Sequence, residues 1–326
     1  MDQICKLYFE LQNKVAEKTG FTPVMCILES EKLFLGISES RTPMFLIDCK
    51  FKSVVADLKL ECISVLFNKV CKLIDDDNEE YLKTCTVIIL NSENYDFQKY
   101  FLEVIYLMLQ NIPQDSTAEQ IKKEIDKIIK LFSCATRPAT KTIQGLWAEL
   151  MVISQSKNPE YLIKAWHPSP NSKFDFNDGI DKVEVKSSST VERIHTFALE
   201  QLNPNENSRI IVASVFAVQT GIGKNINDLR TMIFSRICDV EIQKLLDSII
   251  FQTLGSDLEN AFDLYFDYQL AIDELAFFDS ANIPKIAEEF IPVEISNIRF
   301  SCDLTGVPVI EKDKLQSSQS ILFRSL

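Results

Sequence analysis

The chain has 326 residues, 46% of them hydrophobic and 22 of them Phe, which is enough for a sizeable core in one large domain or two ordinary ones. It contains no unbroken apolar run of about 18 residues and no basic-then-apolar N-terminal signal, so we expect a soluble, cytoplasmic protein without a membrane partner. Nine cysteines without a Cys-x-x-Cys pair, and only two histidines, argue against a disulfide framework and against a structural zinc site.

The formal net charge of −13 is spread unevenly along the chain. Residues 133–200 carry eight basic and eight acidic side chains, whereas residues 239–289 carry twelve acidic and two basic ones. An acidic balance disfavours tight non-specific binding to nucleic acid, although the neutral segment leaves room for a local basic groove. We therefore assign most of the acidity to a solvated or partner-facing surface in the C-terminal part.

Residues 1–133 predict an N-terminal α+β domain that contains no catalytic constellation. The predicted helices cover residues 1–20, 60–74, 97–112 and 117–132. The predicted strands cover residues 24–28, 32–36, 44–47 and 84–90, and the acidic run 75–80 predicts a surface loop. We interpret this domain as an accessory one for contact with a substrate or a partner.

Residues 134–326 predict a second domain that follows a linker rich in small and helix-breaking residues. The predicted elements are a helix over 142–154, a short segment over 162–166, strands over 193–197 and 210–218, and a helical turn over 199–202. Further predictions are helices over 229–246 and 256–262, a strand over 291–300 and a loose tail after residue 314. Residues 265–277 alternate poorly, so strand and helix both remain open there.

The residues with the clearest chemistry lie in the segment 174–186. Asp175 stands between two phenylalanines, and Glu184 and Lys186 alternate with two valines, as in a half-buried strand. The sequence Asn-Asp-Gly at 177–179 predicts a tight turn between the two strands. The folded pair would bring Asp175 close to Glu184 and Lys186, and two carboxylates with an ammonium suit a hard divalent cation and a water.

Two alternatives stand beside this interpretation. The hairpin face could be solvated and carry an ordinary Glu–Lys pair, and Asp178 competes with Asp175, although an Asp beside a turn Gly is favoured for local backbone hydrogen bonds. Three features favour the metal site over these alternatives: the opposite face of both strands is apolar, a helix with Glu149 precedes them, and the Ser/Thr run 187–190 suits a phosphate backbone. We interpret His195 as a structural or DNA-facing residue.

Asp175, Glu184 and Lys186 resemble the three positions of the PD-(D/E)XK signature of restriction-endonuclease-like nucleases. The preceding helix with Glu149 resembles the first core helix of that fold, whose glutamate often joins the metal shell. Phe174 stands at the position of the signature's proline, which varies widely in the superfamily. The whole chain is similar to a bacterial family of PD-(D/E)XK motif proteins found in phage-defence gene clusters.

The resemblance implies an α/β fold with a restriction-endonuclease-like core over residues 134–218, a mixed central sheet flanked by helices, together with the N-terminal domain and a C-terminal extension. It implies Mg²⁺, for which Mn²⁺ can substitute, as the cofactor of metal-assisted phosphodiester hydrolysis. The metal ligands that it implies are Glu149, Asp175, Glu184 and the Val185 carbonyl, and the catalytic residues are Asp175, Glu184, Lys186 and Gln201. Lys186 would orient and activate the attacking water or stabilise the transition state, and Gln201 would steady the water or the scissile phosphate.

The function that the resemblance implies is a metal-dependent endonuclease acting on foreign DNA in a restriction or phage-defence system. An ATPase or a methyltransferase subunit is the expected protein partner, and a homodimer is one expected assembly. The acidic C-terminal part also fits a second class of function, a non-catalytic DNA-binding or assembly subunit that retains a nuclease fold. A third hypothesis is cleavage of RNA or of a branched junction, and metal-dependent cleavage separates the enzymes from the binding subunit.

Overall fold

The computed structural model describes residues 2–14, 22–27, 32–51, 55–74, 79–110, 112–113, 115–139, 141–167, 172–203, 208–287 and 291–326. It has a mixed α/β architecture that divides into two compact units. The first unit contains Met1–Thr140 and Gly255–Glu259, and the second contains Lys141–Leu254 and Asn260–Leu326. The predicted division between residues 133 and 134 coincides with the start of a 3-10 helix, η1 (Ser133–Thr136), and lies seven residues before the division at 140/141.

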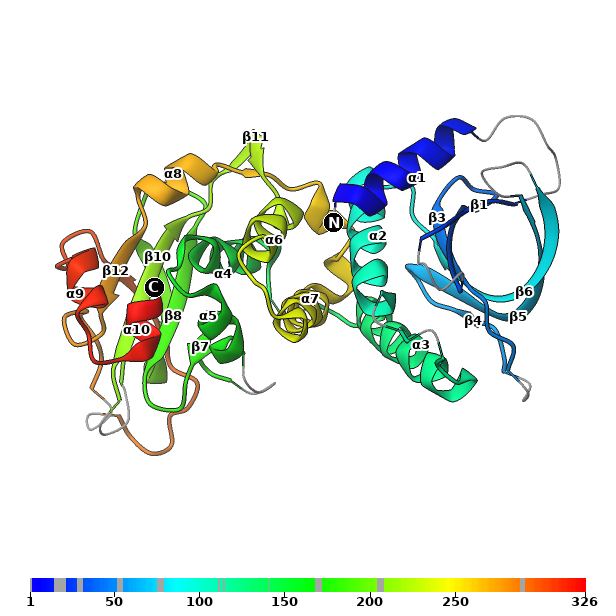
Figure 1. The fold of residues 1–326 in the computed structure, drawn as a ribbon. Coiled ribbons are helices and arrows are strands. Elements are labelled where there is room, and N and C mark those ends of the chain that lie inside the picture. The colour runs from blue at the N-terminus through cyan, green and yellow to red at the C-terminus, as the bar shows by residue number, and fades with distance from the viewer. Residues whose placement is uncertain are drawn as a thin grey trace. The chain divides into compact units, whose positions relative to one another are not determined.

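The first unit is built on a six-stranded, mainly antiparallel sheet with the order β1-β2-β3-β6-β5-β4. Strand β1 also pairs with β5 in parallel, so β1, β2, β3, β6 and β5 close into a ring (Figure 1). The strands are β1 (Thr22–Cys26), β2 (Leu33–Ile37), β3 (Pro43–Ile47), β4 (Leu58–Lys59), β5 (Ile63–Ile74) and β6 (Glu80–Leu90). The helices are α1 (Asp2–Lys14), α2 (Tyr95–Leu109), α3 (Ala118–Phe132) and η3 (Gly255–Asp257), besides η1.

The helix predicted over 60–74 is wrong, because this segment forms strand β5. Ile63, Val65 and Phe67 are buried, whereas the residues between them are half-exposed, and this period of two belongs to a strand. Pairing with β6 on both sides of a bulge between Leu66 and Lys69 holds the segment extended. The other helices and strands predicted before residue 133 are confirmed within the described residues, and positions 75–78 of the predicted acidic loop lie outside them.

The second unit is built on a mixed four-stranded sheet with the order β12-β10-β8-β7. Strands β8 and β10 run parallel, while β7 pairs with β8 and β12 pairs with β10 in antiparallel directions. The strands are β7 (Phe176–Asn177), β8 (Lys182–Ser188), β9 (Ile194–Ala198), β10 (Ile210–Phe216), β11 (Gln219–Lys224), β12 (Ala276–Asp279) and β13 (Arg299–Asp303). The helices are α4 (Ile143–Gln155), α5 (Pro159–Ala165), α6 (Ile226–Phe234), α7 (Val240–Leu254), α8 (Tyr268–Asp273), α9 (Lys312–Gln316) and α10 (Ile321–Ser325), with 3-10 turns η2 (Leu199–Gln201) and η4 (Asn260–Phe262).

Both faces of this sheet are covered. All seven residues of β10 are buried, as expected for a central strand with packing on each face. Helix α4 packs against β8 and β10 (Figure 1). On one face of the sheet, a hydrophobic cluster joins Val212 of β10 to Phe278 of β12 and to Phe197 of β9, which pairs with β13. Strand β9 therefore lies on the face of β10 that carries Val212. The predicted site residues on β8 therefore belong to a strand that pairs with the fully buried β10.

The turn between β7 and β8 forms as predicted. Phe176 pairs with Val183 in antiparallel register, and Gly179 at the turn has a φ of +94°, which glycine adopts without a steric penalty. Asp178 Oδ1 accepts the backbone N–H groups of Ile180 and Asp181 at 3.0 and 2.8 Å. The structure thus gives Asp178 a role in the turn.

Several predictions for the second unit are confirmed, and two predicted helices are wrong because each is two shorter elements in the structure. The helix over 142–154, the strands over 193–197 and 210–218 and the turn over 199–202 correspond to α4, β9, β10 and η2. The single helix predicted over 229–246 is instead two helices, α6 and α7, and the helix predicted over 256–262 is two 3-10 turns. The undecided segment 265–277 contains helix α8 followed by the start of strand β12.

The C-terminal predictions needed the largest corrections. Within 291–300 only the last two residues belong to a strand, β13, which pairs with β9. The tail after residue 314 is not loose, because it contains the end of α9 and the whole of α10. Leu322 and Phe323 of α10 are fully buried, so their burial orders the tail. Among the described helices, none has the length and apolar character needed to cross a membrane.

Candidate active site

Backbone contacts place Asp175 next to the segment that follows α5. Trp166 forms an antiparallel bridge with Phe176, and the His167 N–H donates to the Asp175 carbonyl at 2.9 Å. His167 has a φ of +45°, an uncommon conformation for a residue with a Cβ that costs about 1–3 kcal/mol. The bridge therefore holds His167 and Asp175 side by side at the expense of local strain.

Glu149 reaches the same place from helix α4. The helix begins at its N-cap, Thr142, whose side chain accepts the Gly145 N–H at 3.1 Å. Glu149 Oε2 accepts a hydrogen bond from Trp166 Nε1 at 2.7 Å and lies 2.9 Å from His167 Nε2. These two contacts fix the orientation of a carboxylate that is almost completely buried.

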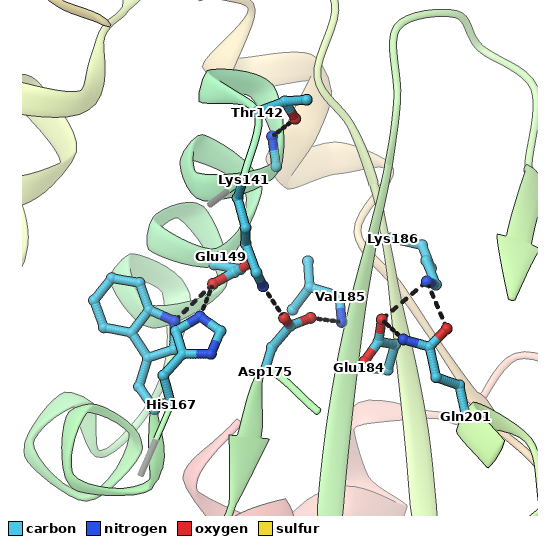
Figure 2. A network of polar contacts seen from close by, with 11 residues as sticks. Lys141, Thr142, Glu149, His167, Asp175, Glu184, Val185, Lys186 and Gln201 are labelled. Carbon is cyan, nitrogen blue, oxygen red and sulfur yellow. Dashed lines mark hydrogen bonds and ion pairs between the residues drawn. The ribbon is translucent and has the colours of Figure 1, made fainter. Parts of the chain in front are cut away.

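The ammonium group of Lys141 lies between two buried carboxylates (Figure 2). Its Nζ donates to Glu149 Oε1 at 2.5 Å and also to Asp175 Oδ1. The side chains of Glu149 and Asp175 are only 3% and 6% exposed, whereas that of Lys141 is 30% exposed. One partly exposed cation thus neutralises part of the charge of two carboxylates that have little contact with water.

The second oxygen of Asp175 is bound by strand β8. The ladder between β7 and β8 ends at Phe176 and Val183, so it does not extend to the Val185 amide. The Val185 N–H instead donates to Asp175 Oδ2 at 2.7 Å. The contact satisfies a buried backbone donor and attaches the Asp175 carboxylate to the strand of the predicted motif.

A second polar group lies on the face of β8 that β9 covers. Lys186 Nζ is 2.9 Å from Glu184 Oε1 and 3.0 Å from Gln201 Oε1, and Gln201 Nε2 donates to Glu184 Oε1 at 2.6 Å. The ammonium also lies 5.1 Å from the centre of the Phe197 ring of β9, a cation–π distance. The backbone N–H of Ala198 completes the group by donating to Gln201 Oε1 at 2.9 Å.

The structure therefore distributes the predicted site residues over two groups. In Figure 2 one group contains Lys141, Glu149 and Asp175, the other contains Glu184, Lys186 and Gln201, and Val185 lies between them. Among the described residues, the one set of three potential metal ligands with donor atoms within 4.8 Å of one another is Glu149, His167 and Asp175. Glu184 as a metal ligand stays a prediction, and so does the Val185 carbonyl, because Val185 contacts Asp175 through its amide N–H.

Burial and neighbouring charges shift the pKa values of the acidic residues in different directions. Burial, reinforced by the charge of Asp175 and only partly offset by Lys186, raises the pKa of Glu184 to about 8. Burial also acts on Glu149, but the hydrogen bond with His167 and the charge of Lys141 outweigh it and lower the pKa to about 2. The pKa of Asp175 is raised by burial and by the charge of Glu149.

The cation of the first group responds in the opposite sense. Burial alone would lower the pKa of the Lys141 ammonium, but the charges of Asp175 and Glu149 raise it above its usual value. Lys141 is therefore a permanent positive charge at neutral pH. At the same pH Glu149 is an anion, whereas Glu184 binds its proton more tightly than an ordinary carboxyl does.

Sequence reasoning missed Lys141 and the contact of His167 with Glu149. Lys141 directly precedes the N-cap of α4, a position where a lysine carries no recognisable signal of a site. His167 is brought in by a left-handed backbone conformation at a position that is neither Gly nor Asn. Glu149 and Asp175, the two carboxylates of this group, were both predicted, Glu149 from its place on the helix and Asp175 from its place beside the turn.

The donor set of the first group fits a hard divalent cation. Glu149 Oε1 and Asp175 Oδ1 are carboxylate oxygens that already share one cation, the Lys141 ammonium. Glu184 Oε2 is buried and has no hydrogen-bond partner among the described residues. A buried carboxylate oxygen without a donor leaves an acceptor for a cation or a water, in keeping with the predicted role of Glu184.

Comparison with protein-family models identifies the family to which these residues belong. Searches of the curated proteins and of the solved structures find no match. A family model described as "Putative PD-(D/E)XK family member" (DUF4420) matches residues 29–305, which is most of the chain and includes both polar groups. The predicted resemblance to PD-(D/E)XK proteins is thereby confirmed, and the chain belongs to this PD-(D/E)XK family.

Proposed function

We propose that this chain is a metal-dependent nuclease that hydrolyses phosphodiester bonds, with its active site between α4 and the β7–β8 hairpin. The observation that carries the proposal is the pair of buried carboxylates, Glu149 and Asp175, gathered around one cation within the residues that the family model matches. Buried carboxylates are unfavourable unless cations compensate them. A pair arranged in this way suits metal-assisted phosphodiester hydrolysis.

The fold of the second unit supports the same proposal. Its mixed sheet, with parallel β8 and β10, a motif-bearing hairpin and helix α4 preceding it, has the order of elements expected of a restriction-endonuclease-like core. The sheet extends beyond the predicted core of residues 134–218, because its edge strand β12 comes from 276–279. We therefore include β12 in the proposed core.

The residues of the site have different roles in the proposed reaction. Glu149 and Asp175, with Glu184 as the predicted third ligand, would hold Mg²⁺ or Mn²⁺ through carboxylate oxygens. Such an ion supplies a water of lowered pKa and neutralises charge that develops on the phosphate. Lys186, held by Glu184 and Gln201, would orient the attacking water or stabilise the transition state through its charge.

Polar side chains near the start of α4 and the end of β8 would contact the phosphate backbone. Gln144 Nε2 donates to Ser187 Oγ at 3.0 Å, which joins the first turn of α4 to β8. Ser189 and Thr190, in the segment that follows β8, are exposed and have the short polar side chains that bind phosphate oxygens. DNA as the substrate, a role in restriction or phage defence, and an ATPase or methyltransferase partner extend the proposal on the strength of the resemblance alone.

One observation favours a second candidate, a DNA-binding or assembly subunit without catalysis. Lys141 already compensates Glu149 and Asp175, so the cluster needs no metal ion for a stable fold. A nuclease fold that had lost its metal could keep a lysine in this place. Cleavage separates the two candidates, since only the enzyme has a turnover that depends on a divalent ion.

The test of the proposed function is incubation of the purified chain with plasmid DNA and either Mg²⁺ or Mn²⁺. Cleavage is expected with the metal and not with a chelator, and Lys186→Met should abolish it while leaving the fold intact. Lys173→Met is the matched control, because Lys173 is exposed and pairs with Glu200 at 3.7 Å, outside both polar groups. Absence of cleavage of DNA, single-stranded RNA and branched DNA would favour the non-catalytic candidate.

A further inference from the structure

Lys141 contacts one oxygen atom of each of the two carboxylates that are the proposed metal ligands. Its Nζ lies 2.5 Å from Glu149 Oε1 and also donates to Asp175 Oδ1. Mg²⁺ binds oxygen ligands at about 2.0–2.1 Å and Ca²⁺ at about 2.3–2.6 Å. An ion that bridges these two oxygens would therefore need the space that the ammonium fills, so the two cations cannot be bound there together.

We propose that Lys141 is a built-in counter-ion that a divalent metal ion must displace from Glu149 and Asp175. This inference rests on the proposed function in one respect only, which is that these two carboxylates are metal ligands. It adds to the site a residue outside the predicted motif, Lys141, which regulates how tightly the site binds a metal ion. The metal-free form is held together by the chain's own cation, and metal binding becomes an exchange of one cation for another.

The contacts indicate that the lysine moves in this exchange while the carboxylates stay in place. Glu149 is held by Trp166 and His167, and Asp175 is held by the Val185 amide. The Lys141 side chain, in contrast, is a flexible stem that is 30% exposed. Its residue lies outside the helix, directly before the N-cap of α4, Thr142. Its ammonium can leave toward solvent without unfolding α4 or the hairpin.

The exchange has two consequences for the site. Without metal, the Lys141 ammonium limits the repulsion between Glu149 and Asp175, so the ligands are already in place before an ion arrives. When a metal ion binds, its apparent affinity is reduced by the fraction of molecules in which the lysine occupies the oxygens. Removal of the lysine should therefore tighten metal binding, although it removes a contact from the folded protein.

The experiment is calorimetric titration of the purified full chain with Mn²⁺ in the absence of nucleic acid. Lys141→Met is expected to lower the Kd for Mn²⁺ by about tenfold or more, because the competing cation is gone. Lys141→Arg keeps a cation in place and should bind Mn²⁺ with an affinity close to that of the wild type. Lys173→Met removes the same charge two residues from Asp175 but outside the cluster, so it measures the effect of net charge alone.

A second measurement uses the wild-type protein and does not depend on how well a variant folds. Acetylation with acetic anhydride, read by mass spectrometry, is expected to modify Lys141 slowly without metal and faster when Mn²⁺ releases the amine. Lys173 serves as the internal reference, and its modification should not change with Mn²⁺. Faster modification of Lys141 supports the exchange even if Lys141→Met proves too unstable to titrate.

The outcomes separate this inference from the proposed function. Equal or weaker Mn²⁺ binding by folded Lys141→Met, or protection of Lys141 that Mn²⁺ leaves unchanged, would overturn the exchange while the carboxylates remain metal ligands. Absence of Mn²⁺ binding in the wild type and in every variant would overturn the exchange together with the proposed metal site. Tighter binding by Lys141→Met in a chain that cleaves no nucleic acid would support the exchange and refute the nuclease.

Discussion

The backbone N–H of Val185 donates to Asp175 Oδ2 at 2.7 Å, so one strand positions both polar groups of the site. Val185 stands between Glu184 and Lys186 in β8, and alternation turns their side chains toward the face covered by β9. Asp175 is thereby held next to the strand without sharing that face, and its other oxygen remains available to Lys141. The site thus has two halves connected through the β8 backbone.

Asp175→Asn should abolish the stabilisation of the protein by metal. Binding of Mn²⁺ to the wild type at a hundredfold excess over Kd adds about 2.7 kcal/mol to the free energy of unfolding by mass action. The amide of Asn lacks the charge that binds a hard cation, although its oxygen can still accept the Val185 N–H. The measurement is the change in melting temperature on addition of Mn²⁺, and the expected change is close to zero for the variant.

Asp178→Asn is the matched control for this substitution. Asp178 accepts two backbone N–H groups through Oδ1 and a hydrogen bond from Tyr161 Oη through Oδ2 at 3.1 Å. The amide oxygen of Asn can still accept the two backbone N–H groups, whereas its NH2 group cannot accept from Tyr161, so the substitution should lower stability slightly without affecting the metal response. A Mn²⁺ response that is lost in Asp178→Asn and kept in Asp175→Asn would transfer the ligand role to Asp178.

Gln201→Leu should impair cleavage without impairing metal binding. Gln201 bonds to both Lys186 and Glu184, and the Leu side chain is of similar size but can form neither contact. Loss of the position of a catalytic group by about 1 Å costs about 100-fold in rate, and we expect a decrease of that order in kcat. Glu200→Gln, one residue earlier, should cleave like the wild type, and full activity of Gln201→Leu would remove Gln201 from the account.

The sequence predicted the fold most reliably where a local pattern is compatible with only one kind of secondary structure. Helices α2 and α3 and the β7–β8 turn are of this kind, since amphipathic spacing and an Asn-Asp-Gly turn leave little choice. Strand β5 was mistaken for a helix because its extended form is imposed by pairing with β6, a contact distant in the sequence. The tail after residue 314 was mistaken for a loop because its few apolar residues are buried by tertiary packing.

The acidic residues of the candidate site were predictable from the sequence, but Lys141, the cation that neutralises two of them, was not. Asp175, Glu184 and Lys186 share a short segment, so local spacing pointed to them, and Glu149 lies on the helix that precedes it. The contact of Lys141 with Asp175 joins residues 34 positions apart and depends on the path of the chain through α5. Spacing in the sequence cannot predict a contact of that kind.

Leu322→Ala should destabilise the second unit by about 2–5 kcal/mol, the usual cost of truncating a buried leucine. Leu322 is fully buried in α10, whereas its neighbour Ile321 is 51% exposed, so Ile321→Ala should change stability by no more than about 0.5 kcal/mol. Urea unfolding followed by tryptophan fluorescence reports this unit alone, because Trp147 and Trp166 both belong to it. Equal stabilities of the two variants would mean that α10 does not pack as described.

Glu184→Gln should change how the stability of the metal-free protein depends on pH. The folded pKa of Glu184 is raised from 4.5 to about 8, so between these values the folded state keeps a proton that the unfolded state has released. Its contribution to stability is therefore fully present below pH 4.5 and is lost as the pH rises through 8. Relative to Glu184→Gln, the wild type should lose at most about 1.4 kcal/mol for each pH unit in this window.

The comparison of the two proteins isolates Glu184 from the other titrating groups. Asp175, whose pKa is also raised, and His195, whose pKa burial together with Lys186 and Arg193 lowers to about 4, are present in both proteins, so their effects largely cancel in the difference. Urea unfolding followed by tryptophan fluorescence between pH 5 and pH 8 provides the measurement, and Glu192→Gln, an exposed acid, should parallel the wild type. Saturating Mn²⁺ should flatten the wild-type curve, since a metal ligand is bound as the anion. Parallel curves for the wild type and Glu184→Gln without metal would show that Glu184 is ionised in the folded protein throughout this range.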